Sequence, residues 1–236
     1  MSGRPALGIT ARTIAPLVSL STVIQPPETS LLNPDGAPMK LPKLWKSLLI
    51  LSAATGASGA IAADPQVDVK TNLGTIRLEL YPAKAPKTVE NFLRYVREGH
   101  YNGTVFHRVI KNFMIQGGGF DANFRQKPTH AAIRNEAEPA VKAGLKNEVG
   151  SIAMARTSDP HSATAQFFIN VNNNAFLNWG DPRSDGNGYA VFGKVVAGMD
   201  VVTKLAQTPT GAGGPFPSDV PREAVTIESM VLVGGK

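Results

Sequence analysis

Residues 106–118 read Phe106-His107-Arg108-Val109-Ile110-Lys111-Asn112-Phe113-Met114-Ile115-Gln116-Gly117-Gly118, and this stretch decides the fold class. Large apolar side chains occur at both odd and even positions, with Phe113 on the same face as Val109 and Ile115. This pattern is typical of a β-strand that is buried on both faces. Lys111-Asn112 interrupts the run and predicts a turn between two strands. We therefore expect a β-rich protein.

Arg108 is the charged residue of this stretch that is best placed to meet a ligand. A guanidinium keeps its charge at the mouth of an apolar concavity and offers five N–H donors in a rigid fork. Arg108 is therefore a candidate anchor. An arginine in a surface ion pair explains the same spacing equally well, so both interpretations stay open. His107 is expected to be a structural histidine, held by hydrogen bonds next to Arg108 and without a role in proton transfer.

Apolar and amide side chains near Arg108 indicate a binding pocket. Phe113, Met114 and Phe168 are candidates for its walls, although each one alone is also typical of an ordinary core. Gln116 and Gln166 lie in apolar surroundings, where an amide without a partner costs about 1–3 kcal/mol. The partner is either the backbone of a bound peptide or the neighbouring protein backbone. Because no nucleophile or carboxylate pair accompanies these residues, the pattern favours recognition of an amide.

Five ordered motifs resemble the cyclophilins, the peptidyl-prolyl cis-trans isomerases built on an eight-stranded β-barrel. The resemblance runs from about Val67 to Val233 and is strongest with the bacterial branch, particularly its exported periplasmic members. It implies isomerisation of Xaa-Pro bonds in proline-containing polypeptides, with no cofactor and no metal. The motifs are Phe-His-Arg-Val-Ile (106–110), Phe-Met-Ile-Gln-Gly-Gly (113–118), Ile-Ala-Met-Ala-Arg (152–156), Ser-Ala-Thr-Ala-Gln-Phe-Phe-Ile-Asn (162–170) and Tyr-Ala-Val-Phe-Gly-Lys-Val (189–195).

The resemblance also implies roles for individual residues. Arg108 matches the catalytic arginine of the family, Phe113 and Met114 match the floor of its proline pocket, and Gln116 matches its hydrogen-bonding glutamine. Ala155 matches a small position that lets the substrate backbone lie close. The catalytic group is thus Arg108, Gln116 and Phe113, and the substrate-binding group is Met114, Ala155, Arg156, Gln166, Phe168, Phe176, Leu177 and Tyr189.

Three positions depart from the eukaryotic pattern. Phe176 stands where many eukaryotic members have tryptophan, Tyr189 where they have histidine, and Arg156 where they have asparagine beside the substrate backbone. All three residues occur in the bacterial pattern, so catalysis is expected to be intact. Binding of the family's inhibitor cyclosporin is expected to be weak.

Two functions fit these motifs. The first is an isomerase that acts on exported, partly folded chains. The second is a peptide-binding chaperone of the same fold whose catalysis is incidental. Arg108 favours the enzyme, because a binder of proline-containing peptides needs the pocket but no cation near the proline nitrogen.

The rest of the chain from residue 67 predicts a closed antiparallel barrel. Alternation on both sides of Asn72-Leu73-Gly74 predicts a hairpin. Apolar residues from Val89 to Val96 share one helical face, with Pro86 in the first turn, and a second helix is expected at about Met199–Gln207. Val225–Val233 supplies a last strand. We expect a mainly β fold, a closed eight-stranded antiparallel β-barrel capped by two α-helices.

The residues before this domain resemble an export signal. Residues 39–62 combine a basic start, an apolar segment that is shorter than the ~20 residues of a membrane span, and the cleavage pattern Ala60-Ile61-Ala62. We expect residues 1–38 to be a disordered extension or to precede the true start at Met39, residues 63–66 to be a linker, and residues 67–236 to be the isomerase domain. Periplasmic location follows, with no stable membrane insertion after cleavage; an uncleaved anchor is the alternative.

Composition excludes several other functions. The chain has no cysteine, which excludes disulfides and thiol chemistry. The net charge is +6, but from residue 63 onward 19 basic residues face 16 acidic ones, without basic blocks, so nucleic acid is not an expected partner. The four histidines lack metal-ligand spacing. Gly117-Gly118-Gly119 is not expected to be a phosphate-binding loop, because no Gly-Lys-Ser/Thr follows it, and is expected to turn the backbone.

The protein is expected to be a monomer.

Overall fold

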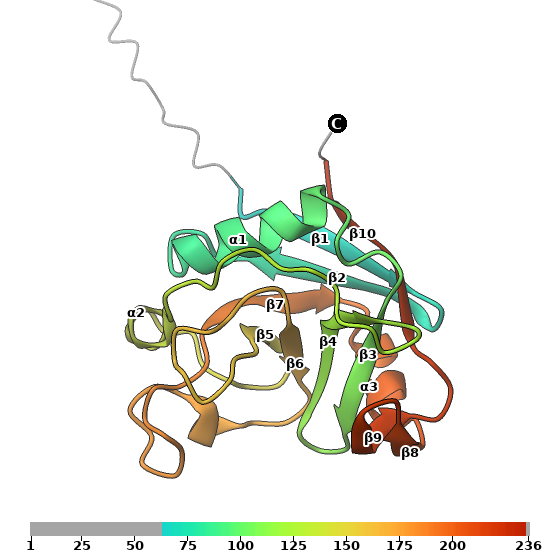
Figure 1. Ribbon diagram of the computed structural model, residues 1–236. Helices are drawn as coiled ribbons and strands as arrows, with labels where there is room; N and C mark the ends of the chain where they lie inside the picture. Colours follow the sequence, from blue (N-terminus) through green and yellow to red (C-terminus); the bar gives the residue numbers. More distant parts are fainter. Residues whose placement is uncertain (1–62, 235–236) are drawn as a thin grey trace, which may run out of the picture. The chain divides into compact units, whose positions relative to one another are not determined.

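The computed structural model describes residues 63–234 of this protein (Figure 1). Within them, eight antiparallel strands close into a barrel in the order β1-β10-β3-β4-β6-β5-β7-β2, which confirms the predicted fold class. The barrel strands are β1 Gln66–Thr71, β2 Gly74–Leu80, β3 Thr104–Ile110, β4 Met114–Asp121, β5 Ser151–Met154, β6 Phe167–Asn170, β7 Val191–Ala197 and β10 Thr226–Leu232.

Both predicted helices are present and pack at the ends of the barrel (Figure 1). α1 spans Pro86–Arg97, with proline in its first turn, and α3 spans Met199–Ala206. Each helix adds side chains to the barrel core, such as Phe92 from α1 and Leu205 from α3. The apolar periodicity identified them because only one face of each helix is buried.

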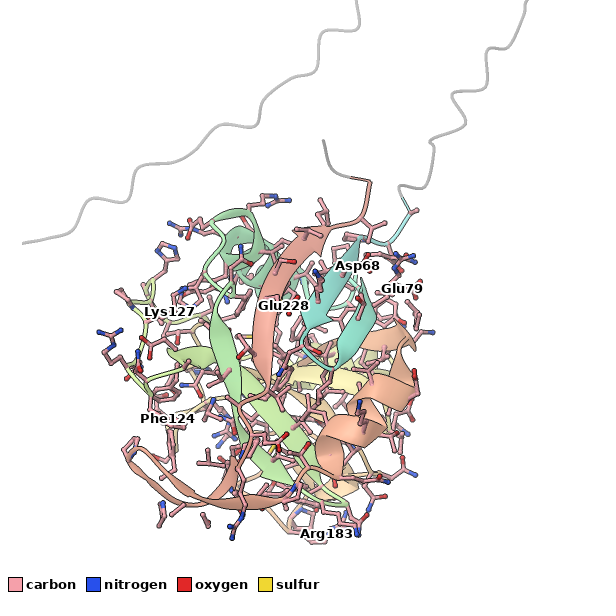
Figure 2. The ribbon with its side chains drawn as sticks, turned by 90° about the vertical axis from the view of Figure 1, so that its right-hand side faces the viewer. Asp68, Glu79, Phe124, Lys127, Arg183 and Glu228 are labelled. Carbon is pink, nitrogen blue, oxygen red and sulfur yellow. The ribbon has the colours of Figure 1, made fainter. Side chains whose placement is uncertain are left out.

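Short elements outside the barrel were not predicted. They are the helix α2 Ala137–Lys142, the 3-10 turn η2 Ala175–Leu177, and the two-stranded sheet of β8 Thr210–Gly213 and β9 Phe216–Pro221. α2, η2 and β8 are too short for a sequence period to be recognised, and β9 contains two prolines, which argue against a strand. The β8–β9 hairpin lies beside β3 (Figure 2), and Phe124 packs on Phe216 of β9 with ring centroids 6.1 Å apart.

Strand alternation separates two hydrophobic clusters. On β6, Phe167 and Ile169 enter the barrel core, whereas Phe168 faces outward into a second cluster. On β4 the inward residue is Ile115 and the outward one is Met114. Successive residues of a strand point to opposite faces, so the outer cluster is a direct consequence of the inner one. The prediction of strands that are buried on both sides is correct.

Two local expectations are wrong. Phe113 belongs to the turn between β3 and β4 rather than to a strand, and Asn112 before it has φ +60°. Gly117-Gly118-Gly119 does not turn the chain but lies inside β4. At Gly118, where φ is +86°, a Cβ atom would lie 2.8 Å from the ring of Tyr101. The glycines are therefore needed for close packing within a strand.

Candidate functional site

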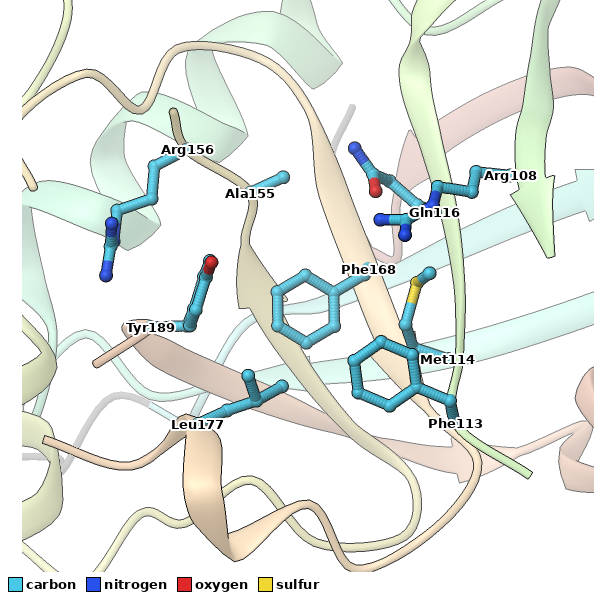
Figure 3. Close-up of a pocket in the computed structure, with 9 residues that line it drawn as sticks. All are labelled: Arg108, Phe113, Met114, Gln116, Ala155, Arg156, Phe168, Leu177 and Tyr189. Carbon is cyan, nitrogen blue, oxygen red and sulfur yellow. The ribbon is translucent and has the colours of Figure 1, made fainter. Parts of the chain in front are cut away.

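A pocket of about 170 Å³ opens on the outer face of the barrel over the second hydrophobic cluster (Figure 3). A cavity of about 150 Å³ holds one benzene molecule, so this volume suits one small ring. Nine residues line it: Arg108, Phe113, Met114, Gln116, Ala155, Arg156, Phe168, Leu177 and Tyr189. All nine belong to the predicted site, and the structure brings them together.

Sheet register explains how residues far apart in the chain meet here. Arg108 on β3 is the pairing partner of Gln116 on β4, and Gln116 in turn pairs with Phe168 on β6. Phe168 pairs with Ala153 on β5. Residues that are directly opposite one another on adjacent strands share a face of the sheet. Across these four strands, the outer face therefore changes from the polar residues Arg108 and Gln116 to the apolar residues Phe168 and Ala153.

A β-bulge places Arg108 on this outer face. The β3–β4 register shifts between Phe106 and Arg108. Phe106 and Val109 both enter the barrel core, so His107 and Arg108 between them both lie outside it. Strict alternation would have placed Arg108 on the same face as Phe106. Bulges commonly re-aim a side chain next to an active site.

Arg108 both lines the pocket and makes a surface ion pair, which are the two interpretations that its spacing left open. Its side chain is 46% exposed, and Nε lies 3.8 Å from Oδ2 of Asp219 on β9. The same guanidinium lines the pocket, opposite the apolar side chains (Figure 3). The ion pair with Asp219 restrains the planar guanidinium of Arg108, whose N–H donors lie at the pocket mouth. Asp219 itself has φ +68°, a left-handed conformation that Asp and Asn adopt more readily than other non-glycine residues.

His107 is buried beneath the β8–β9 hairpin rather than exposed to the pocket. Its ring packs on Phe120 and Phe216, with centroids 4.7 and 5.4 Å apart. Burial, together with a smaller effect of the charge of Arg108, lowers the pKa of His107 to about 4. Within residues 63–234 its Nδ1 has no hydrogen-bond partner. The expectation that hydrogen bonds hold this ring is therefore wrong for Nδ1, where aromatic packing dominates.

The two glutamines bind one another. Gln116 Nε2 donates to Gln166 Oε1 at 2.9 Å, which leaves each amide a second polar group for a ligand. Gln166 lines a neighbouring polar hollow of about 320 Å³ instead of the apolar pocket, and Gln116 borders both. Gly119 makes room for this arrangement, because a Cβ atom there would lie 2.5 Å from Gln166 Cγ.

Aromatic contacts build the apolar end of the pocket. Phe168 meets Tyr189 edge to face, with centroids 5.6 Å apart. Phe176 is half-buried and stacks on the lining residue Phe113, with ring centroids 5.7 Å apart, but does not itself line the pocket. The role expected for Phe176 as the outer wall is therefore indirect, whereas Leu177 reaches the pocket itself.

Within residues 63–234 no three side chains of His, Asp or Glu come together as a potential metal site. The same part of the chain has no helix that is long and apolar enough to cross a membrane.

The outer face of this closed eight-stranded barrel therefore combines an arginine at the pocket mouth, a pair of hydrogen-bonded glutamines and an apolar hollow of about the size of one ring. The chain belongs to the cyclophilin-type peptidyl-prolyl cis-trans isomerase family, whose model matches residues 66–232. It is an isomerase of Xaa-Pro bonds and binds proline-containing peptides as substrates.

Known proteins support this assignment. The chain is 54% identical to Peptidyl-prolyl cis-trans isomerase B of Escherichia coli over 166 residues, which are 70% of this chain and 98% of that protein. It is 52% identical to a peptidyl-prolyl cis-trans isomerase of Acinetobacter baylyi, over 80% of this chain and 96% of that protein. Among solved structures it resembles a cyclophilin of Cryptosporidium parvum, with a TM-score of 0.57, 27% identity and coverage of 73% of this chain and 99% of that chain.

Three residues that support the site were not predicted from the sequence. Asp219 lies on a hairpin that was not predicted, Asp185 lies in a polar loop, and Gly119 was assigned to a turn. The left-handed φ of Asp219 has no sequence signal of its own. A glycine-rich segment that follows a strand of large side chains is a usable signal for close packing, and it could have identified Gly119.

Proposed function

We propose that this isomerase accelerates rotation by binding the twisted amide more tightly than the planar one, with Arg108 as the discriminating group. The observation that carries the proposal is that Arg108 lines the same pocket as Phe113, Phe168 and Leu177. A proline ring held by the apolar side chains would present its nitrogen toward the guanidinium.

The chemistry of the amide explains why one donor is sufficient. Rotation breaks C–N resonance and must overcome a barrier of about 18–20 kcal/mol. In the twisted state the proline nitrogen becomes pyramidal and regains a lone pair, which an N–H of Arg108 can bind. The planar amide offers no such acceptor, so this hydrogen bond favours the transition state alone. A lowering of the barrier by about 8 kcal/mol corresponds to roughly a millionfold acceleration.

The remaining residues would keep one end of the substrate still. Gln116 and Gln166 present amide groups beside Ala155, whose small side chain lets a peptide backbone lie close. Anchoring the backbone on one side of the prolyl bond converts binding energy into rotation of the other side. A Cryptosporidium parvum cyclophilin, 28% identical to this chain, was crystallised in the presence of the dipeptide Ala-Pro.

Arg108→Lys in the full chain tests this mechanism. A flexible ammonium cannot reproduce a planar fork, so we expect kcat/KM toward an Ala-Pro peptide to fall at least about tenfold, with unchanged stability. Arg94→Lys is the matched control, because Arg94 is an exposed arginine on α1 that pairs with Glu98. Wild-type turnover by Arg108→Lys in a protease-coupled assay would refute the mechanism.

We also propose that the clients are exported, partly folded proteins in the periplasm. Support comes from the signal-like pattern of residues 39–62, which lie outside the described residues. Cleavage after Ala62 would give a mature chain that starts at Ala63, or at Asp64 if the boundary slips by one residue. The intact mass of protein from a periplasmic extract decides this. Recovery of the full-length chain in the cytoplasm would contradict the proposal.

A further inference from the structure

The side chain of Arg156 has almost no exposed surface, although the residue lines the pocket. Its side chain is 3% exposed. Nη2 donates to both carboxylate oxygens of Asp185, at 2.9 and 2.7 Å, and Nη1 donates to the carbonyl of Thr157 at 2.9 Å. Nε donates to the carbonyl of Gly188 at 3.1 Å. All three nitrogens of the guanidinium are therefore engaged by the protein itself.

The same guanidinium lies against the ring that closes the pocket. Arg156 Cζ is 4.4 Å from the centroid of the Tyr189 ring. Figure 3 shows Tyr189 between Arg156 and Phe168, and Phe168 meets the tyrosine edge to face at 5.6 Å. A cation over an aromatic face and an aromatic edge on its other side restrict the ring from two directions.

The backbone that carries Tyr189 is restricted as well. The carbonyl of Gly188 accepts hydrogen bonds from Arg156 and from Asn135 Nδ2, both at 3.1 Å. Gly188 has φ +64°, and a Cβ atom there would lie 2.4 Å from the backbone nitrogen of Trp179. Tyr189 N donates to the carbonyl of Leu177, another pocket residue, at 2.9 Å. Arg156 thus connects Asp185, the Gly188 peptide and the Tyr189 ring into one unit.

We propose that Arg156 is a positioning residue rather than a ligand of the substrate backbone. Together with Asp185 it holds Tyr189 in place as the far wall of the proline pocket. The inference rests on the proposed function, in which this pocket holds the proline ring. We call the Arg156–Asp185 pair the clamp. Without it, the substrate has to order the Tyr189 ring each time it binds, which weakens binding. The Arg108 side of the pocket is unaffected, so the effect falls on KM and not on kcat.

Asp185 supplies the decisive experiment because it does not line the pocket and cannot touch the proline ring. Asp185→Asn in the full chain removes the charge with little change of volume, and the wild-type carboxylate side chain is 40% exposed, so folding is expected to be retained. KM for an Ala-Pro peptide should rise about three- to tenfold while kcat stays within about twofold. The matched control is Asp181→Asn, in the same loop, where the carboxylate pairs with Arg183; its KM should equal that of the wild type.

A second readout follows the ring in the free protein. The chain has four tyrosines, so labelling with ring-¹³C tyrosine gives a simple spectrum in which Tyr189→Phe assigns the signal. Asp185→Asn and Arg156→Gln should both shift the Tyr189 signal, and the double variant should raise KM no further than Arg156→Gln alone. This readout needs no turnover, so it tests the clamp even if the proposed role of Arg108 fails.

A different set of results would overturn the inference. If Arg156→Gln raised KM while Asp185→Asn left both KM and the Tyr189 signal unchanged, Arg156 would bind the substrate directly. Equal KM increases in Asp185→Asn and Asp181→Asn would show a general effect of loop charge and would also exclude a specific clamp. Because the Arg156 side chain is buried, its own variant is the one at risk of misfolding; if it does misfold, comparison of Asp185→Asn with Asp181→Asn still tests the clamp.

Discussion

Gly119→Ala should disable the glutamine pair by adding one methyl group. The new Cβ would lie 2.5 Å from Gln166 Cγ, 2.6 Å from Cδ and 2.7 Å from Nε2. Carbon atoms in contact normally lie about 3.5–4.0 Å apart, so the side chain must retreat by about 1 Å. The 2.9 Å bond between Gln116 and Gln166 would then stretch beyond about 3.5 Å, where it is no longer a hydrogen bond.

The expected loss is in activity rather than in stability. Displacement of the Gln166 amide should cost one hydrogen bond to the substrate backbone, which is worth about 0.5–1.5 kcal/mol, and loss of the Gln116–Gln166 bond costs folding a similar amount. At about 1.36 kcal/mol per tenfold, kcat/KM should therefore fall about two- to tenfold. The φ of Gly119 is not in the left-handed region, so its backbone accepts alanine, and alanine is favoured over glycine in a strand by about 0.5–1 kcal/mol. Stability should therefore change little, which separates the two effects.

A protease-coupled assay on an Ala-Pro peptide, combined with denaturant unfolding, tests this prediction. Gly211→Ala is the matched control, because a Cβ atom there meets only ordinary contacts with Arg222, the nearest at 3.6 Å. In the Gln166→Ala background, Gly119→Ala should have no further effect, since the displaced side chain is gone. A folded Gly119→Ala variant with wild-type kcat/KM, or full additivity with Gln166→Ala, would refute the reasoning.

Three further predictions concern the arginine, the inhibitor and pH. Asp219→Asn keeps a residue that tolerates φ +68° but removes the carboxylate near Arg108; kcat/KM should fall by up to about fivefold in the protease-coupled assay, and this loss should vanish in the Arg108→Lys background. Phe176 lacks an indole N–H, so cyclosporin should bind weakly, and Phe176→Trp should tighten its Kd by about two- to tenfold in calorimetry. Burial lowers the pKa of His107 to about 4, below an unfolded value of about 6.5, so the stability due to its neutral ring should be complete above about pH 6.5 and lost as pH falls toward about 4. Denaturant unfolding at about pH 7 and about pH 4.5 should therefore show a smaller acid loss in His107→Gln, whereas kcat/KM should stay flat between about pH 6 and 9.

Periodic features of the fold were predictable from sequence, whereas features set by neighbouring strands were not. The apolar spacing of 89–96 identified α1, and alternation identified the β1–β2 hairpin, because burial of one face leaves a direct imprint on the chain. The bulge at His107-Arg108 has no such imprint. It exists because β3 pairs with β4 in a shifted register, and only the assembled sheet shows it.

The predicted site was complete for lining residues but not for the residues that support them. The family motifs identified Arg108, Gln116 and Phe168 as site residues, because these residues are part of the motifs, and all three line the pocket. Asp219 and Asp185 support Arg108 and Arg156 from segments outside any motif, and long-range ion pairs are not visible in a local pattern. Phe176 stacks on the lining residue Phe113 but does not itself line the pocket.

Separation of the two hydrophobic clusters explains how this fold forms a surface pocket without opening its core. The inner cluster closes the barrel with residues such as Phe167 and Ile115, and the outer one, with Phe168 and Met114, forms the pocket. The inner cluster is packed inside the barrel, whereas the outer cluster keeps a hollow of about 170 Å³ on the surface. In the proposed mechanism, amide rotation needs a shaped pocket and one oriented donor. Strand alternation in β4 and β6 supplies the pocket walls, and the bulge in β3 directs Arg108 toward them. Substitutions in the outer cluster should therefore change catalysis before they change folding.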